Sequence, residues 1–566
     1  MPTYAWVIDQ TTCIGCHACT TACKAENDVP LGVNRTWVKY VETGTFPETS
    51  RQMAVLRCNH CADAPCVEIC PTRAMFQRPD GIVDFDASRC IGCKACLQAC
   101  PYDAIFIDPG DHTAEKCNFC SHRVDQGLLP SCVVVCPTQS LTFGDLDDPA
   151  SRAARLVAAQ PTTVRRPEQG TRPKAFYIGA SDAVLDPLAA RHEERYVWAD
   201  RRTGGAKDYT AELATWGWPA GESKAGMALP VLPLGVAAQA PGLGTMRAPS
   251  GAGPATPSTA AGGPVAAAPS GAARPRVARV AYDIYHPRPW GWPVALYLWT
   301  KGLGAGAFGV LFLALALGGA TADTGVRLVA AFVALAGTGV TAVLLAADLK
   351  RPERFWTILV RAQLRSWLAI GAFILVGYSG ALGLWFLGTL VGVGDGLLVP
   401  LGWATFVLGV WAALYTAFLL AQCEARDLWQ NPVTAVVLLA QATILGSAAL
   451  LVITVAFGVT GELSDLARLA LAVGGVVNLG ALVLGEAFGR HPTANARAAA
   501  HLLVRGPWRF GFWIGGVGLA GALPVLAAAA LAGAPGPLAA IGLVAAAGLL
   551  WYEQGFVAAG QAVPIS

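Results

Sequence analysis

The second half of the chain is dominated by long, uninterrupted apolar segments. Eight of these segments are long enough to cross a bilayer, which takes about 20 residues in a helix. They lie near residues 295–317, 326–347, 366–390, 398–421, 432–457, 467–488, 510–532 and 537–558. A large buried helical core is the alternative, but so many consecutive long segments with few internal charges favour a membrane domain. We therefore expect an all-α domain of eight transmembrane helices over residues 274–566.

The segment before this domain has a very different composition. Residues 217–273 consist almost wholly of Gly, Ala, Pro, Ser and Thr. Such a segment buries too little apolar surface to offset the entropy that its chain would lose on folding. We therefore expect a flexible linker that joins two independently folded parts.

All of the 17 cysteines except Cys423 lie near the start of the chain, in four groups with short spacing. In chain order, the groups are Cys13, Cys16, Cys19 and Cys23; Cys58, Cys61, Cys66 and Cys70; Cys90, Cys93, Cys96 and Cys100; and Cys117, Cys120, Cys132 and Cys136. Three nearby thiolates can hold one face of an iron–sulfur cluster, and a fourth, on a short helix, can bind the partner cluster. Structural zinc normally uses two separated pairs of ligands, so this spacing fits zinc poorly. The pattern predicts iron–sulfur clusters.

Short apolar runs that flank the cysteine groups are candidate strands. They cover residues 4–9, 82–85, 104–107 and 140–143. Strands next to cluster ligands predict an α+β, double ferredoxin-like head over residues 1–150. It would contain two modules of two clusters each, with the outer module split by insertion of the inner one. Residues 151–216 are expected to extend this domain.

The four cysteine groups resemble those of the electron-transfer subunits of the dimethyl sulfoxide and polysulfide reductase group. The resemblance implies that the first group pairs with the fourth and the second with the third. The implied ligand sets are Cys13, Cys16, Cys19 and Cys136; Cys117, Cys120, Cys132 and Cys23; Cys58, Cys61, Cys66 and Cys100; and Cys90, Cys93, Cys96 and Cys70. No ligand is missing from these sets, so we expect four [4Fe–4S] clusters, with these sixteen cysteines as iron ligands.

The membrane part resembles the NrfD/polysulfide-reductase membrane subunits. The resemblance rests on residues 289–302, 348–355, 415–422 and 490–493, of which the second segment reads Asp-Leu-Lys-Arg-Pro-Glu-Arg-Phe. It implies a site for a quinone, menaquinone or ubiquinone, near the attached iron–sulfur head. The covalent fusion differs from the separate subunits that are usual in this family.

None of the eight histidines falls in the middle of an expected transmembrane helix. Haem of the cytochrome b type needs His ligands on such helices, so we expect no haem and direct electron exchange between a cluster and quinone. Polar groups at membrane depth are costly and suggest function. The quinone-site candidates on the head side are His286, Trp290, Lys301, Asp348, Arg354 and Glu424. All of them except His286 also have a structural interpretation, as a membrane anchor, an interface aromatic residue or an ion pair with a neighbouring Arg.

Charge is divided unevenly along the chain. Residues 1–150 carry 11 basic and 18 acidic side chains, whereas 15 of the 17 Lys and Arg residues of 274–566 fall on the head side of the expected membrane. By the positive-inside rule, this distribution predicts a multi-pass protein of the inner membrane with a cytoplasmic head. The first residues show no export signal, which agrees with that side. No nucleic-acid partner is expected.

These patterns favour an electron-transfer and membrane-anchor subunit that links a molybdopterin-type catalytic subunit to quinone in the lipid bilayer. No pterin-binding domain is recognisable in the chain, so substrate conversion is expected in the partner and only quinone oxidation or reduction here. The alternative is a redox-driven proton-translocating module of a larger respiratory complex with further subunits. Glu486 and Tyr415 are candidate residues of a proton path. A zinc-stabilised scaffold on a membrane anchor is the third possibility.

Overall fold

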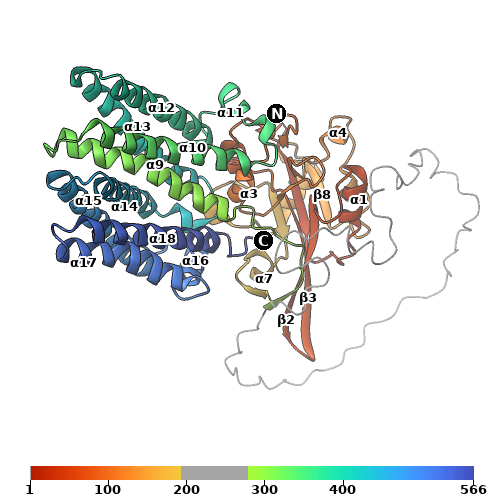
Figure 1. Cartoon of the computed structure of the whole chain (residues 1–566). Coiled ribbons are helices and arrows are strands. Elements are labelled where there is room, and N and C mark those ends of the chain that lie inside the picture. Colours follow the sequence, from red (N-terminus) through yellow and green to blue (C-terminus); the bar gives the residue numbers. More distant parts are fainter. Residues whose placement is uncertain (1, 193–277) are drawn as a thin grey trace, which may run out of the picture. The chain divides into compact units, whose positions relative to one another are not determined.

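The structure, a computed structural model, describes residues 2–192 and 278–566 (Figure 1). The linker expected at 217–273 and the last part of the extension expected at 151–216 lie outside the described residues. The cysteine-rich head and the helical domain belong to one compact unit of the chain. Their contacts with each other are therefore part of the fold.

The first sheet of the head joins the beginning of the chain to strands that follow the last cysteine group. β1 (Tyr4–Asp9) pairs antiparallel with β8 (Leu141–Asp145) and parallel with β10 (Ala175–Ile178). β9 (Thr162–Thr163) completes the sheet at the β10 edge. Residues 5–8 of β1 are all buried, because both faces of this strand are covered. The expected strands at 4–9 and 140–143 are confirmed.

The second sheet has the strand order β11-β12-β2-β3. β2 (Thr36–Thr45) and β3 (Glu48–Arg57) form a long hairpin, which Figure 1 shows clearly. β12 (Ala278–Tyr282) pairs antiparallel with β2, and β11 (Ala190–His192) lies parallel to β12. The chain that leads into the membrane domain therefore contributes a strand to the head. This arrangement differs from the expected pair of independently folded parts.

Two short hairpins complete the strands of the head. β4 (Met75–Gln77) pairs with β5 (Val83–Phe85), and β6 (Ile105–Ile107) pairs with β7 (Ala114–Lys116). β5 and β6 are the strands expected at 82–85 and 104–107. Each of them pairs with a three-residue strand that is too short to leave a recognisable pattern in the sequence.

Short helices carry the third cysteine of each group. These helices are α1 (Ala18–Glu26), α2 (Pro65–Glu68), α3 (Ala95–Ala99) and α5 (Ser131–Val134). The other helices of the head are α4 (Ser121–Val124), α6 (Arg152–Ala159) and α7 (Asp182–Leu185). The α+β ferredoxin-like head that the sequence predicts is thus present.

Within residues 2–192 and 278–566, eight helices are long and apolar enough to cross a membrane. They are α9 (Trp292–Ala316), α10 (Thr324–Ala347), α12 (Trp367–Leu390), α13 (Asp395–Ala421), α14 (Val433–Ala456), α15 (Glu462–Gly480) with its π-helical continuation η4 (Ala481–Ala487), the π-helical η5 (Gly511–Ala522) with α17 (Leu523–Ala530), and α18 (Pro535–Gly560). Shorter helices between them are α11 (Thr357–Val360) and α16 (Ala494–Val504). The expectation of eight spans is confirmed.

The bounds of these helices depend on polar residues that the apolar pattern ignores. α15 begins at Glu462, five residues before the expected start at 467. Glu462 and Asp465 lie in its first turn, where negative charge stabilises the positive end of the helix dipole. A helix therefore extends past its apolar segment when the charges of its terminal residues stabilise that end of the helix dipole.

Glycines bring the central helices α9 and α14 close together, and these two helices are the most enclosed of the eight. A Cβ atom on Gly306 would collide with the carbonyl oxygen of Ala442, and one on Gly446 would collide with the backbone of Gly306. Small residues at such crossings allow close helix packing where no hydrophobic effect drives association. The other helices expose large apolar side chains, as lipid-facing helices do.

Candidate electron-transfer site

The first and third cysteine groups contain the same two backbone turns. Gly15 and Gly92, just before the second cysteine of their groups, have φ of 69° and 66°. His17 and Lys94, just after that cysteine, have φ of 61° and 64°. Left-handed backbone is uncommon for residues other than glycine, so these paired turns are a specific feature. They bend each group tightly around its cysteines before the short helix begins.

Cysteines of the first and fourth groups are neighbours. Burial raises the pKa of the Cys13 thiol, and repulsion from a Cys136 thiolate adds to that rise. Burial raises the pKa of Cys23 to about 12, and repulsion from Cys132 and Cys120 contributes to it. Thiols that repel each other in this way share one region of the head, although their positions in the sequence are about a hundred residues apart.

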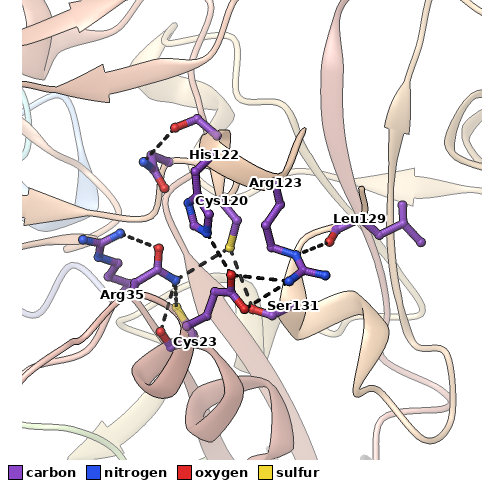
Figure 2. Close-up of polar contacts among 11 residues, drawn as sticks. Cys23, Arg35, Cys120, His122, Arg123, Leu129 and Ser131 are labelled. Atoms are coloured by element: carbon purple, nitrogen blue, oxygen red, sulfur yellow. Dashed lines mark hydrogen bonds and ion pairs between the residues drawn. The ribbon is translucent and has the colours of Figure 1, made fainter. Parts of the chain in front are cut away.

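A cavity in this region is lined by one full ligand set of the crossed pairing, Cys23, Cys117, Cys120 and Cys132. The side-chain amide of Asn27 donates to two of these sulfur atoms, and its Nδ2 lies 3.7 Å from Sγ of both Cys23 and Cys120. Figure 2 shows Cys23 and Cys120 facing each other across this network, with Arg35 beside them. Arg35 Nη1 donates to Asn27 Oδ1 at 2.9 Å and fixes the amide orientation.

Cysteines of the second and third groups are neighbours in the same sense. Burial raises the pKa of Cys93 to about 12, and repulsion from Cys70 is the next cause. Burial likewise raises the pKa of Cys100 to about 12, with repulsion from Cys58. The structure therefore brings together thiols from the groups that the family resemblance pairs.

The surroundings of Arg57 show whether the cysteines suit an iron–sulfur cluster. This side chain is fully buried, and its Nη1 donates to Cys132 Sγ at 3.2 Å. Its Nε and Nη2 atoms have no hydrogen-bond partner among the described residues. A buried cation surrounded by thiols is costly unless negative charge balances it, and an iron–sulfur cluster with its thiolates supplies that charge. The soft sulfur ligands fit such a cluster as well.

Single metal ions are a different case. In the part of the chain that the structure describes, no group of three His, Cys, Asp or Glu side chains is placed to hold one ion. A four-iron cluster distributes its thiolates over four irons instead.

The third cysteine group contacts the loop that follows α10. The backbone N–H groups of Lys350 and Arg351 donate to the carbonyl oxygens of Gly92 and Ile91, at 3.2 and 3.1 Å. A Cβ atom on Gly92 would lie 2.5 Å from Cβ of Lys350, so glycine is needed for this approach. The turn between two cysteines is thus fitted against the membrane domain.

Two of the quinone-site candidates strengthen the same contact. Both carboxylate oxygens of Asp348 accept hydrogen bonds from Lys94 Nζ, at 2.8 and 2.9 Å. Arg354 Nη1 donates to the carbonyl oxygens of Ala87 and Cys90, at 2.8 and 3.0 Å. Asp348 is therefore paired with a lysine of the head. The sequence context suggested a neighbouring arginine, Arg351 or Arg354, as its partner instead.

A third candidate, Trp290, lies between this cysteine group and the bundle. Its indole Nε1 donates to the Cys93 carbonyl oxygen at 3.4 Å, and its ring stacks on Trp429 with the ring centres 5.5 Å apart. Its backbone N–H donates to Gln561 Oε1 at 3.1 Å. Trp290 is buried. It is thus an aromatic contact between a predicted cluster ligand and the membrane helices.

His286 belongs to a charged cluster at the base of the head. Its Nδ1 lies 2.6 Å from Asp103 Oδ2, and its Nε2 lies 3.3 Å from Asp283 Oδ1. Burial alone would lower the pKa of His286, but the two carboxylates outweigh burial and raise it to about 10. His286 is therefore a cation at neutral pH, and it links the head to the strand that enters the membrane domain.

The remaining two candidates are separate from this contact. Glu424 follows α13, and burial together with repulsion from Glu68 and Asp63 raises its pKa to about 7. Lys301 is buried inside the bundle, where its Nζ donates to Ala413 O at 3.2 Å and to the Thr416 hydroxyl. The structure thus brings Trp290, Asp348 and Arg354 to one cysteine group and leaves the other candidates elsewhere.

Two polar residues of this region were not singled out by the sequence patterns. Lys94 is one, although a charged side chain between two predicted ligands is a visible signal. Glu553 of α18 is the other, with 2% of its surface exposed and with both carboxylate oxygens lacking a partner among the described residues. Its signal is an acidic residue without a basic neighbour in an apolar segment. Glu486, a sequence candidate, is also buried and accepts from Asn431 Nδ2 at 3.1 Å.

Two known families match separate parts of the chain. Residues 282–563 match the family described as "Polysulphide reductase, NrfD", and residues 50–146 match the "4Fe-4S dicluster domain". Relatives of the head include a tetrathionate reductase subunit of Salmonella typhimurium, which is 45% identical over 192 residues, or 33% of this chain and 77% of the relative. A polysulfide reductase subunit of Wolinella succinogenes is 41% identical over 181 residues, or 31% of this chain and 93% of the relative. Protein NrfC of Escherichia coli is 44% identical over 178 residues, or 31% and 80%.

Proposed function

The chain belongs to the family of iron–sulfur reductase subunits and also contains an NrfD-type membrane domain, and we propose that it carries electrons between a molybdopterin-type catalytic subunit and quinone. The matched iron–sulfur family supports electron transfer, and the matched NrfD family supports membrane anchoring. The membrane domain would anchor the complex in the inner membrane, with the head on the cytoplasmic side.

The sixteen cysteines of the four groups would hold four [4Fe–4S] clusters in the crossed pairing. The cavity lined by Cys23, Cys117, Cys120 and Cys132 supports this pairing, because it joins one cysteine of the first group to three of the fourth. Each cluster supplies one-electron redox chemistry when it is bound. The protein residues set the ligand order, exclude water by burying the thiols and provide donors to the sulfur atoms.

The observation that carries the proposal is the contact between the third cysteine group and the membrane domain. Cys90 and Cys93 offer their carbonyl oxygens to Arg354 and Trp290. The cluster proposed for this group would therefore be the one closest to membrane-bound quinone. Trp290, Asp348 and Arg354 would border the quinone site, and Lys301 would form its polar interior.

The opposite end of the path would face the catalytic subunit. Around the first and fourth cysteine groups, the head exposes Ile14, Leu128, Leu129, Val134 and Val135. Ile14 is 60% exposed and Val134 is 57% exposed. Clustered apolar side chains on a protein surface mark interaction sites. A catalytic subunit docked here would deliver or withdraw electrons at the end of the head that the membrane domain does not cover.

Two buried carboxylates favour proton uptake as a second function of the membrane domain. Glu486 and Glu553 lie inside the bundle, and each has at least one oxygen without a hydrogen-bond partner in the described part of the chain. Ionisable groups at membrane depth are costly and are functional-site candidates by default, and proton relays are one of their known roles. They would supply protons to quinone even if no proton crosses the membrane.

The proposal is tested with the full chain, purified anaerobically in detergent and mixed with a reduced menaquinone or ubiquinone analogue. We expect about sixteen irons per chain and reduction of the clusters by the quinol, followed by EPR. Trp290→Ala and Arg354→Gln should slow this reduction, whereas Arg468→Gln, on the other side of the bundle, should leave it unchanged. Clusters that dithionite reduces but quinol does not would overturn the quinone link.

The partner surface is tested separately. Ile14→Asp combined with Val134→Asp should abolish co-purification of a large catalytic subunit and leave quinol-driven reduction of the clusters intact. Loss of both properties would mean that the substitutions disturb the head itself.

A further inference from the structure

Arg57 has an unusual position for an arginine. It is the last residue of β3, and none of its side chain is accessible to solvent. Its Nη1 donates to Cys132 Sγ at 3.2 Å. The guanidinium carbon lies 4.3 Å from the ring centre of Trp6, which covers it on one side. The charge is therefore fixed in a place where water does not screen it.

The charge of Arg57 is balanced by no carboxylate among the described residues. The acidic groups that act on it most strongly are the thiols of Cys132, Cys117 and Cys19. Arg35, which lies near the same cavity, differs because its Nη2 is paired with Glu115 Oε2 at 2.8 Å. Arg57 thus directs its positive charge at cysteine sulfur, whereas the charge of Arg35 is shared with a carboxylate.

A second donor acts on the same ligand set. Asn27 Nδ2 donates to Cys23 and Cys120, while Arg57 donates to Cys132, so three of the four sulfur atoms in one set accept from these two side chains. In the other sets, the described donors to sulfur are backbone N–H groups and hydroxyls. Cys90, for example, accepts from the N–H groups of Gly92 and Ala114, at 3.4 and 3.3 Å.

The physical consequence follows from charge. One-electron reduction adds one negative charge to a cluster, and hydrogen bonds and nearby charge set its potential. A cation fixed in a water-excluded site acts through a low dielectric and stabilises the more negative state more strongly. Charged donors also form stronger hydrogen bonds than neutral ones.

We propose that Arg57 makes the cluster held by Cys23, Cys117, Cys120 and Cys132 the first of the four to accept an electron. The inference rests on the proposed function in assigning a cluster to these ligands. Arg57 acts through Cys132 and is therefore a positioning and tuning residue. An electron that enters the head would therefore be held mainly by this cluster between the reactions at the catalytic subunit and at quinone.

The test is an EPR-monitored redox titration of the full chain with chemical mediators, so neither quinone nor the partner subunit is needed. The variants are Arg57→Met, which removes the charge, Arg57→Lys, which keeps it, and Asn27→Leu, which removes the amide donor. Arg172→Met is the matched control, because Arg172 is exposed and its side chain pairs, among the described residues, only with Asp63. Iron content is measured for every variant.

In the unaltered chain, one signal should appear before the other three during reduction. Arg57→Met should reduce the equilibrium constant for that step at least tenfold, which is about 59 mV for a one-electron couple. Asn27→Leu should move the same signal in the same direction, Arg57→Lys should move it less than Arg57→Met, and Arg172→Met should leave it in place.

The proposal is overturned if Arg57→Met keeps its iron and changes all four reduction steps by less than threefold. It is also overturned if Arg57 and Asn27 variants shift different signals. If Arg57→Met loses iron, Arg57→Lys and Asn27→Leu test the proposal instead. An unchanged first signal in Asn27→Leu would then refute the proposal. A chain without any four-iron EPR signal would instead refute the proposed function.

Discussion

The ammonium group of Lys94 lies 2.8 and 2.9 Å from the two carboxylate oxygens of Asp348. Lys94 stands between two cysteines of the third group, and Asp348 follows the last residue of α10. The lysine side chain is 7% exposed and the aspartate side chain 21%. This ion pair therefore joins the backbone around a predicted cluster to the end of a transmembrane helix, largely out of water.

Removing one partner of this pair should weaken the contact between the head and the membrane domain. Asp348→Asn leaves the Lys94 charge without a carboxylate, and breaking such a pair costs about 2 kcal/mol or more. We expect the head to unfold at a lower temperature and its clusters to be reduced more slowly by quinol. Lys94→Gln should have the same effect.

A double-mutant cycle separates this docking role from proton exchange by Asp348. If the pair acts only in docking, Lys94→Gln with Asp348→Asn should be less harmful than the sum of the single changes. Glu353→Gln is the control, because Glu353 is exposed and pairs with Arg351 within its own loop. A full effect of Asp348→Asn in a chain that already carries Lys94→Gln would point to a role for Asp348 in quinone chemistry.

The two strands on either side of residues 193–277 are neighbours in one sheet. β11 precedes these residues, β12 follows them, and the two strands are parallel neighbours. We predict that a chain cut by a protease at a site inserted between residues 217 and 273 stays in one piece during size-exclusion chromatography in detergent. β12 would remain paired with β2, and Lys94 would remain paired with Asp348. Separation of the two fragments would show that the covalent connection alone holds the head.

The sequence predicted those features that depend on local patterns. Long apolar segments define the membrane helices within a few residues, because crossing a bilayer is a requirement of length and composition. Regular cysteine spacing indicates iron–sulfur ligands for a similar reason. Lys94 and Asp348 are 254 residues apart, and no periodicity connects them. β12 was missed because its five residues follow a long low-complexity segment and find their partner, β2, in the first fifty residues.

The quinone-site candidates show the same limit. Trp290, Asp348 and Arg354 were selected for depth and polarity, and the structure gives all three a bond to the third cysteine group. His286 was selected on the same grounds but lies against Asp103 of the head. Polarity near the membrane surface therefore identifies residues of an interface without telling which of them a ligand contacts.

His286 predicts a pH dependence of the contact at the base of the head. Its pKa is raised to about 10 by Asp103 and Asp283, above the value of about 6.5 in an unfolded chain. A raised folded-state pKa contributes stability that is fully present below pH 6.5, decreases above it and is lost as the pH passes about 10. We expect the thermal stability of the full chain to fall between pH 7 and pH 10.

His286→Gln should lower stability at pH 7 and flatten this decline, because glutamine keeps a hydrogen-bonding side chain but cannot carry the charge. His112→Gln is the comparison, since no ion pair of His112 is found among the described residues. Differential scanning fluorimetry across the pH range measures both. An unchanged slope in His286→Gln would assign the pH dependence to other groups.

The side of the membrane on which the head lies gives the last prediction. The excess of basic residues near the head predicts a cytoplasmic head by the positive-inside rule. Some of these residues have a second reason to be there, since Arg354 and the backbone of Lys350 and Arg351 bind the head directly. An acidic head would favour a basic contact surface on either side of the membrane, so the two explanations need separate evidence.

Cysteine labelling in intact cells supplies that evidence. Thr321 and Thr460 are exposed in the loops at the far ends of α9 and α14, and Glu353 is exposed beside the head. For a cytoplasmic head, a membrane-impermeant maleimide added to intact cells should label Thr321→Cys and Thr460→Cys but label Glu353→Cys only after the cells are opened. The unaltered chain, with its exposed Cys16, is the background control. The reverse labelling pattern would place the head outside the cytoplasm and would leave docking of the acidic head as the reason for the basic surface.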